Sequence, residues 1–116
     1  IEMLESQTGV SIREFTLAGM PEEKMFAHKW YLGTDEKIDA ADFARRIDDN
    51  LKILNDDYRT ERLHAVQNVY VEVLPLNVFY DYMRKQGKEG GQNKFPRVIK
   101  GAKLEEWQAY LNEIKS

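Results

Sequence analysis

The spacing of apolar residues predicts helices near both ends of the chain and in its middle. Residues 1–8 form a short helical stretch ending at Gly9, a residue suited to the left-handed backbone that follows a helix. Asp39 can cap a longer helix, in which apolar residues recur every three or four positions to about Leu63. A final helix repeats this spacing up to Ile114. From these two stripes we expect a core containing Ile47, Leu51, Leu54, Trp107 and Leu111.

Three other stretches are typical of β-strands. Residues 10–18 are rich in β-formers, and the change of apolar phase within them indicates a bulge or a strand buried on both faces. Residues 25–33 alternate between two faces, with Trp30 on one of them, and residues 69–75 form a third valine-rich strand. A turn at residues 19–21 joins the first two strands into a predicted hairpin.

The remaining segment predicts a short helix and a loop. The helix is expected to begin at Asn77 and to stop at Gly87, before the glycine-rich stretch and the final helix. The order of elements is then α-β-β-α-β-α-loop-α. This order predicts an α+β fold in which a small mixed or antiparallel sheet of three or four strands is flanked by helices. The 116 residues are expected to form a single domain, residues 1–116.

Composition narrows the classes of function. The hydrophobic share of 42% and the charged share of 32% are those of an ordinary folded domain, and the net charge of −3 gives no reason to expect nucleic acid or an anionic membrane as a partner. The absence of cysteine excludes disulfides, thiolate metal sites and a cysteine nucleophile, and it fits a cytoplasmic protein. No apolar run approaches the length of a membrane span.

Residues 87–97 are the strongest candidate for a site. They combine three glycines, three long cations, two side-chain amides and a proline, a composition suited to a shaped loop that holds an anion such as phosphate. Seven Lys and Arg residues lie between Arg84 and Lys103, against the single acid Glu89. The alternative is a solvated connection between two helices.

Two other groups carry weaker signals. The acidic stretch Asn55-Asp56-Asp57-Tyr58 offers paired carboxylates for acid–base chemistry, but on a helix such a cluster is more often a solvated face. His28 and His64 are far apart and lack the spacing of metal ligands, so no metal site is predicted. His28 is best interpreted as a half-buried core residue.

Two stretches resemble a known family, the auxin-responsive promoter family of acyl-acid amido synthetases. Residues 47–58 (IDDNLKILNDDY), with Arg62 after them, are similar to the long helix of its C-terminal domain. Residues 90–97 (GGQNKFPR) resemble its Gly-Gln-x-Lys-x-Pro-Arg loop, and this is the most specific part of the match. Similarity to its first strand and short helix extends the resemblance over nearly the whole chain.

The resemblance implies a C-terminal lid domain of an adenylate-forming ligase. Such an enzyme uses ATP and Mg²⁺ to convert a small carboxylic acid into an acyl-adenylate, and then transfers the acyl group to an amine such as an amino acid. The partner would be an N-terminal adenylation domain of roughly 350 to 400 further residues. The opening residues, which read as the tail of a helix, also suggest a fragment. Alone, the chain is expected to be inactive and to bind no cofactor.

By the same resemblance, Lys94 corresponds to the mobile catalytic lysine. Gly90, Gly91, Gln92 and Arg97 would form the loop around the substrate phosphate. The alternative for Arg97 is a purely structural pair with Asp57 or Glu61, and this alternative stays open here. A different class of function also stays open, namely a stand-alone regulatory or interaction domain that binds an acidic partner or a small ligand such as a free amino acid.

Overall fold

The computed structural model describes residues 1–22, 25–86 and 95–115. In chain order these residues form α1 (Glu2–Thr8), β1 (Glu14–Glu22), β2 (Met25–Gly33), α2 (Ala40–Leu54), α3 (Asp56–His64), β3 (Val66–Leu74), α4 (Leu76–Lys85), β4 (Val98–Ile99) and α5 (Gly101–Lys115). The predicted α+β class and the flanking of a small sheet by helices are confirmed. Within the described ranges, no helix has the length and apolar character needed to cross a membrane.

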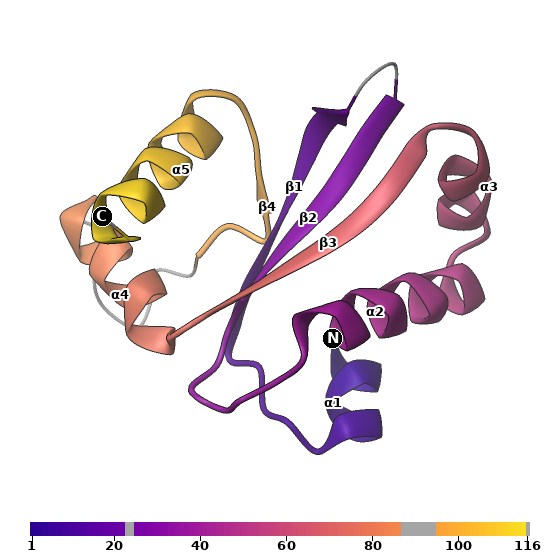
Figure 1. Ribbon diagram of the computed structural model, residues 1–116, viewed down its shortest axis with the longest axis horizontal. Helices are drawn as coiled ribbons and strands as arrows, with labels where there is room; N and C mark the ends of the chain where they lie inside the picture. Colours follow the sequence, from indigo (N-terminus) through magenta and orange to yellow (C-terminus); the bar gives the residue numbers. More distant parts are fainter. Residues whose placement is uncertain (23–24, 87–94, 116) are drawn as a thin grey trace.

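The sheet is mixed, with the strand order β3-β2-β1-β4. β1 and β2 form the predicted antiparallel hairpin, whereas β3 runs parallel to β2 and the short β4 runs parallel to β1. α1, α2 and α3 lie on one side of the sheet, and α4 and α5 lie on the other (Figure 1). The sheet therefore separates two apolar layers.

Alternation along β2 supplies both layers, as its pattern predicts. Trp30 and Leu32 face α1 and α2, while Tyr31 faces α4 and α5. Side chains of successive strand residues point to opposite faces, so a strand between two helical layers is apolar on both. Gly33 closes β2 where no side chain fits, since a Cβ there would lie 2.9 Å from the ring of Phe79.

The first strand begins and ends later than predicted. Residues 10–13 lie outside β1, and the Ile12 N–H donates to the Glu5 side chain at 2.7 Å instead of to a neighbouring strand. The predicted turn at residues 19–21 is wrong, because pairing with β2 continues to Glu22 opposite Met25. β3, by contrast, begins earlier than predicted, at Val66 instead of Val69.

The long middle helix is in fact two helices. Asp39 caps α2 as predicted, accepting from the N–H groups of Ala41 and Asp42. At Asn55 the backbone is extended, with φ −144°, and the Asn55 side chain accepts the Tyr58 N–H at 3.0 Å to begin α3. The change of direction moves Leu54 out of the predicted core, and its side chain is 66% exposed.

The other predicted core residues and helix ends follow from the same packing. Ile47, Trp107 and Leu111 are buried as expected, and Leu51 is half-buried. Gly9 has φ 72° and ends α1, as predicted. α4 is capped at Pro75 rather than Asn77, and it ends at Lys85. The predicted stop at Gly87 lies outside the described residues.

Candidate functional site

The glycine-rich loop is described only in part. Gly90, Gly91, Gln92 and Lys94 lie outside the described residues, so their predicted roles stay predictions. Phe95, Pro96 and Arg97, which directly follow them, are described. What the structure shows of this candidate site is therefore how the two ends of the loop are held.

The upstream end of the loop is α4, which is amphipathic. Its inner face buries Val78, Phe79, Tyr82 and Met83 against the sheet and α5. The Gln86 N–H donates to the carbonyl oxygen of Tyr82 at 3.1 Å, which closes the last turn. The loop therefore starts from a helix that is fixed by its packing.

The downstream end is fixed by Phe95, which is 1% exposed. Its ring centroid lies 4.8 Å from that of Trp107 and 5.0 Å from that of Phe79, with interplanar angles of 64° and 75°. The Tyr82 ring lies 5.8 Å away on α4. Edge-to-face contacts of this kind stabilise aromatic clusters beyond simple burial. The residue that follows Lys94 is thus a buried anchor, a role that the motif alone did not indicate.

Arg97 is held against β1. Its guanidinium pairs with the carboxylate of Glu14 at 3.2 Å, donates to the carbonyl oxygen of Phe15 at 3.2 Å, and lies 4.3 Å from the centroid of the Phe15 ring. The backbone joins in, because the Leu17 N–H donates to the Arg97 carbonyl oxygen at 2.9 Å. The suggested pairs with Asp57 or Glu61 are therefore wrong, since Glu14 takes that place.

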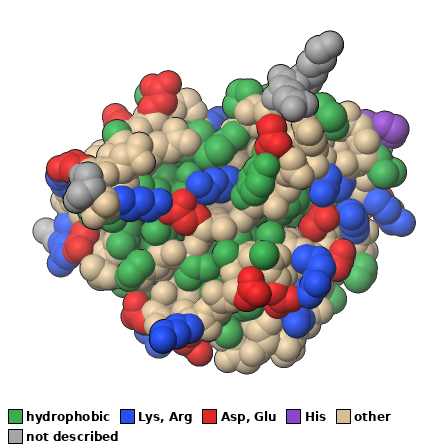
Figure 2. Space-filling view, viewed as in Figure 1, with side chains coloured by type: hydrophobic (Ala, Val, Ile, Leu, Met, Phe, Trp, Pro, Cys, Tyr) green, Lys and Arg blue, Asp and Glu red, His purple; other side chains and the backbone are tan. Residues whose placement is uncertain are grey.

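The excess of cations around the loop is partly neutralised in the folded chain. Arg84 pairs with Asp81, and Lys85 lies 3.7 Å from Glu113 and over the ring of Tyr110. With the pair between Arg97 and Glu14, three of the described cations in this stretch have acidic partners. Acidic and basic side chains are also interspersed across the face drawn in Figure 2. These described residues therefore do not form a broad positive patch.

The acidic stretch at Asn55 serves the helix ends. Asn55 caps α3, and Asp56 pairs with Arg59 one turn later while remaining exposed. The carboxylates at the start of α3 also interact favourably with the positive end of the helix dipole. This arrangement supports the interpretation as a solvated, capped helix end.

A partly buried polar cluster under α3 was not predicted from the sequence. The Asp48 carboxylate accepts from the Tyr58 hydroxyl at 2.8 Å and from Arg62 Nε at 3.0 Å, and Lys52 lies 3.1 Å away. Arg62 also donates to the carbonyl oxygens of residues 66 and 67 at the start of β3. The cluster joins α2, α3 and β3, which makes it structural.

The electrostatics of this cluster follow from burial and pairing. Burial acts to raise the pKa of Asp48, but hydrogen bonds from Tyr58 and Lys52 and the charge of Arg62 outweigh it, so the pKa is lowered. Burial, and then the hydrogen bond to Asp48, raises the pKa of Tyr58. His28 is half-buried as predicted, 5.9 Å from the Tyr58 ring, and burial lowers its pKa. The shifts of Asp48 and Tyr58 favour the ionised carboxylate and the protonated hydroxyl, which are the forms that make the hydrogen bond between α2 and α3.

No group of three potential ligands among His, Asp and Glu is arranged to hold a metal ion in the part of the chain that the structure describes.

Together, the sheet, the two helical layers and the anchored residues Phe95 and Arg97 define a small α+β domain. Comparison with known proteins then gives the family: residues 1–103 match the GH3 family C-terminal domain, and the chain belongs to the GH3 family. This confirms the resemblance to the auxin-responsive promoter family. No curated protein sequence matches the chain.

Two solved structures show the same fold. The chain is similar to the GH3.15 acyl acid amido synthetase, with a TM-score of 0.65 and 16% identity, and to AtGH3.15 acyl acid amido synthetase in complex with 2,4-DB, with a TM-score of 0.63 and 15% identity. Each alignment covers 96% of this chain and 21% of the solved chain. The chain therefore spans about a fifth of the length of these relatives.

Proposed function

We propose that this chain is the mobile C-terminal domain of an ATP-dependent acyl-acid amido synthetase. The observation that carries the proposal is the match to the GH3 C-terminal domain over residues 1–103. The similarity to two acyl acid amido synthetases, each about five times longer, supports a longer enzyme in which a large N-terminal domain holds most of the substrate contacts. Such an enzyme would be cytoplasmic, and neither nucleic acid nor a membrane would be a partner.

The proposed reaction has two steps. A carboxylate oxygen of the acid attacks the α-phosphorus of ATP, the bond to the β-phosphate oxygen breaks, and pyrophosphate leaves. The amine nitrogen then attacks the acyl carbon of the adenylate, AMP leaves with the bonding electrons, and the amine loses a proton. Mg²⁺ would neutralise phosphate charge from outside the described residues.

In this proposal Lys94 supplies a positive charge at the α-phosphate and the attacking carboxylate. Its support is the loop sequence together with the anchoring of the next residues. Phe95 is locked into the aromatic cluster, and Arg97 is tied to Glu14 and Phe15. A positive charge stabilises a developing negative charge only when the backbone that carries it is held in position, because misplacement weakens the interaction. Arg97 would position the loop, while Gly90, Gly91 and Gln92 would shape it.

The alternative, a stand-alone domain that binds an acidic partner, receives less support. Several cations of the basic stretch are already paired within the chain, which lowers the positive charge available to a partner. A surface that binds an acidic partner would leave these cations without acidic partners inside the domain.

The test is ATP–pyrophosphate exchange by the full-length gene product, measured together with thermal melting. We expect Lys94→Ala to reduce exchange by about two to three powers of ten and to leave the melting temperature unchanged, since a charge acting on the transition state contributes little to folding. Lys100→Ala, which removes an exposed cation from the same stretch, is the matched control. Exchange within about twofold of wild type for Lys94→Ala would overturn its proposed role.

A further inference from the structure

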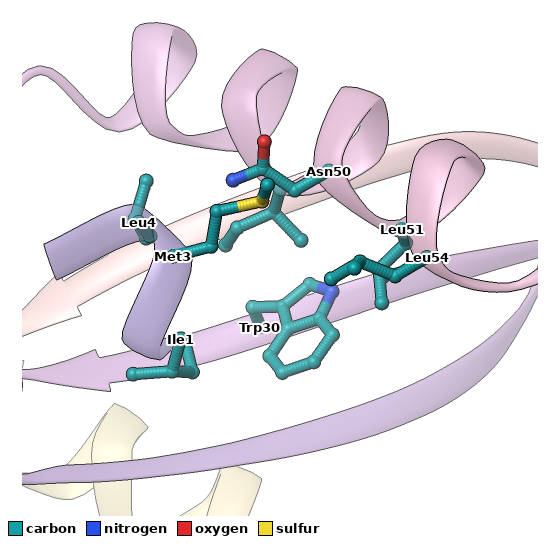
Figure 3. Close-up of a pocket in the computed structure, with 8 residues that line it drawn as sticks. Ile1, Met3, Leu4, Trp30, Asn50, Leu51 and Leu54 are labelled. Carbon is teal, nitrogen blue, oxygen red and sulfur yellow. The ribbon is translucent and has the colours of Figure 1, made fainter. Parts of the chain in front are cut away.

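An apolar hollow lies between α1, α2 and β2, on the side of the sheet away from α4 and α5. It has a volume of about 410 Å³ and is lined mainly by apolar side chains, among them Met3, Trp30, Leu51 and Leu54. Figure 3 shows Trp30 beneath the C-terminal half of α2, with Met3 of α1 and Leu51 and Leu54 of α2 around it. Leu54 is 66% exposed, so the rim of the hollow is open to solvent.

The apolar surface continues from this hollow across the sheet. Leu17 of β1 is directly opposite Trp30 in the antiparallel register, and Val98 of β4 is opposite Leu17 in the parallel register. Paired residues share one face of a sheet and lie side by side. We call this surface the uncovered apolar face and define it by Met3, Leu17, Trp30, Leu51, Leu54 and Val98. Leu54 and Val98 are exposed, Met3, Leu17 and Leu51 are half-buried, and Trp30 forms the buried floor.

Among the described residues, the helices leave the β1 side of this face open. α2 packs mainly on β3, whereas the tertiary contacts of β1 are mainly with β2 and β4. Val98 is 62% exposed as a result. Exposed apolar residues such as Val98 and Leu54, next to half-buried apolar neighbours, are typical of interaction sites on folded proteins.

The chemistry of the face favours apolar side chains as its occupant. The amide of Asn50, a polar group at the hollow, is already engaged in two hydrogen bonds of 3.2 Å with the Gln7 amide, one in each direction. The hollow therefore presents hydrocarbon and aromatic surface around an amide whose hydrogen bonds are made within the domain, together with the buried Trp30 Nε1–H, which has no hydrogen-bond partner among the described residues.

We propose that the uncovered apolar face is the surface on which the large N-terminal domain of the full-length enzyme packs, through apolar side chains of its own. The inference rests on the proposed function and deepens it by assigning the interface. The chain matches a C-terminal domain, and about four fifths of each similar solved chain lies outside the aligned part, which leaves a large body of chain to cover the face.

The position of the face relative to the loop supports the same occupant. Arg97 lies over the Phe15 ring, and that ring is 6.1 Å from the ring of Trp30. Phe15 and Leu17 both pack against the layer to which Trp30 belongs. A body seated on the face is therefore next to the anchored end of the loop that carries Lys94.

Hydroxyl-radical footprinting of the full-length protein tests the assignment with an internal control. Leu54 and Leu63 are 66% and 74% exposed in this domain, on neighbouring helices, but only Leu54 belongs to the face. We expect Leu54 to be oxidised about fivefold less than Leu63, because side chains within an interface core are shielded from solvent. Ile114, 45% exposed on α5 across the sheet, is a second unshielded reference.

A variant adds a second readout. Leu54→Asp should raise the oxidation of Val98 several-fold in the full-length protein, since a carboxylate in an apolar interface opens it, whereas Leu63→Asp should leave Val98 unchanged. Equal oxidation of Leu54 and Leu63 would overturn the proposal. Shielding that disappears on dilution would also overturn it, by assigning the face to a second copy of the protein.

The result is independent of catalysis. If the full-length protein shows no pyrophosphate exchange but Leu54 is shielded, the interface is supported and the proposed function is rejected. An active enzyme in which Leu54 is oxidised as readily as Leu63 keeps the function and rejects the interface.

Discussion

Replacing Phe95 with alanine should strongly destabilise the domain. Phe95 is 1% exposed and its ring contacts Phe79, Tyr82 and Trp107. Burying a phenylalanine side chain contributes about 1.5–3 kcal/mol, and each edge-to-face pair adds about 0.5–1.5 kcal/mol. The cavity left among α4, α5 and the sheet adds a further term, so Phe95→Ala should cost about 3–5 kcal/mol of unfolding free energy.

The assay is urea unfolding of the 116-residue chain, followed by far-ultraviolet circular dichroism, because Trp107 fluorescence would itself change with the variant. Val98→Ala, three residues away and 62% exposed, is the control and should change the unfolding free energy by less than about 0.5 kcal/mol. Phe95→Leu, which keeps most of the volume, should fall between the two. A loss below about 1 kcal/mol for Phe95→Ala would show that the ring does not anchor the loop.

Three further predictions concern stability and activity. Leu51→Ala should cost about 1–2 kcal/mol, less than full burial would give, and Leu54→Ala less than about 0.5 kcal/mol, both measured by urea unfolding; equal costs would contradict the break at Asn55. The unfolding free energy should fall as the pH drops below the ordinary pKa of His28, 6.5, because burial lowers the pKa in the fold and the unfolded chain then binds more protons. His28→Phe should flatten this part of the pH profile, and an unchanged profile would exclude His28 as its source. The 116-residue chain alone should release no pyrophosphate from ATP and a carboxylic acid, and release above background would refute its proposed dependence on another domain.

The elements that the sequence predicts well are those whose pattern is tied directly to burial. Alternation over residues 25–33 predicts β2 with the bounds that the structure has, because both faces of that strand are covered. Asp39 and Gly9 also act as predicted, since capping depends on neighbours within one turn. Local chemistry and local periodicity therefore suffice for these parts.

The break between α2 and α3 shows where periodicity misleads. Leu54 and Tyr58 are four residues apart, which fits one continuous helix, yet Leu54 is exposed and Tyr58 is buried. Asn55, followed by two aspartates, is itself a helix-start signal, and its side chain competes for the backbone N–H that a continuous helix would use. A capping signal inside a periodic stripe should therefore outweigh the stripe when the two disagree.

The partners of the loop residues were out of reach of the sequence for a different reason. Arg97 and Glu14 are 83 positions apart, and they meet only because the two residues of β4 pair with β1 in parallel. So short a strand leaves no periodic signal, although it decides which acid neutralises Arg97. From the sequence alone Phe95 is likewise a loop residue, because its burial depends on contacts with α4 and α5. The motif thus identifies the segment that carries the proposed catalytic lysine, whereas the positions of Phe95 and Arg97 are set by tertiary contacts with β1, α4 and α5.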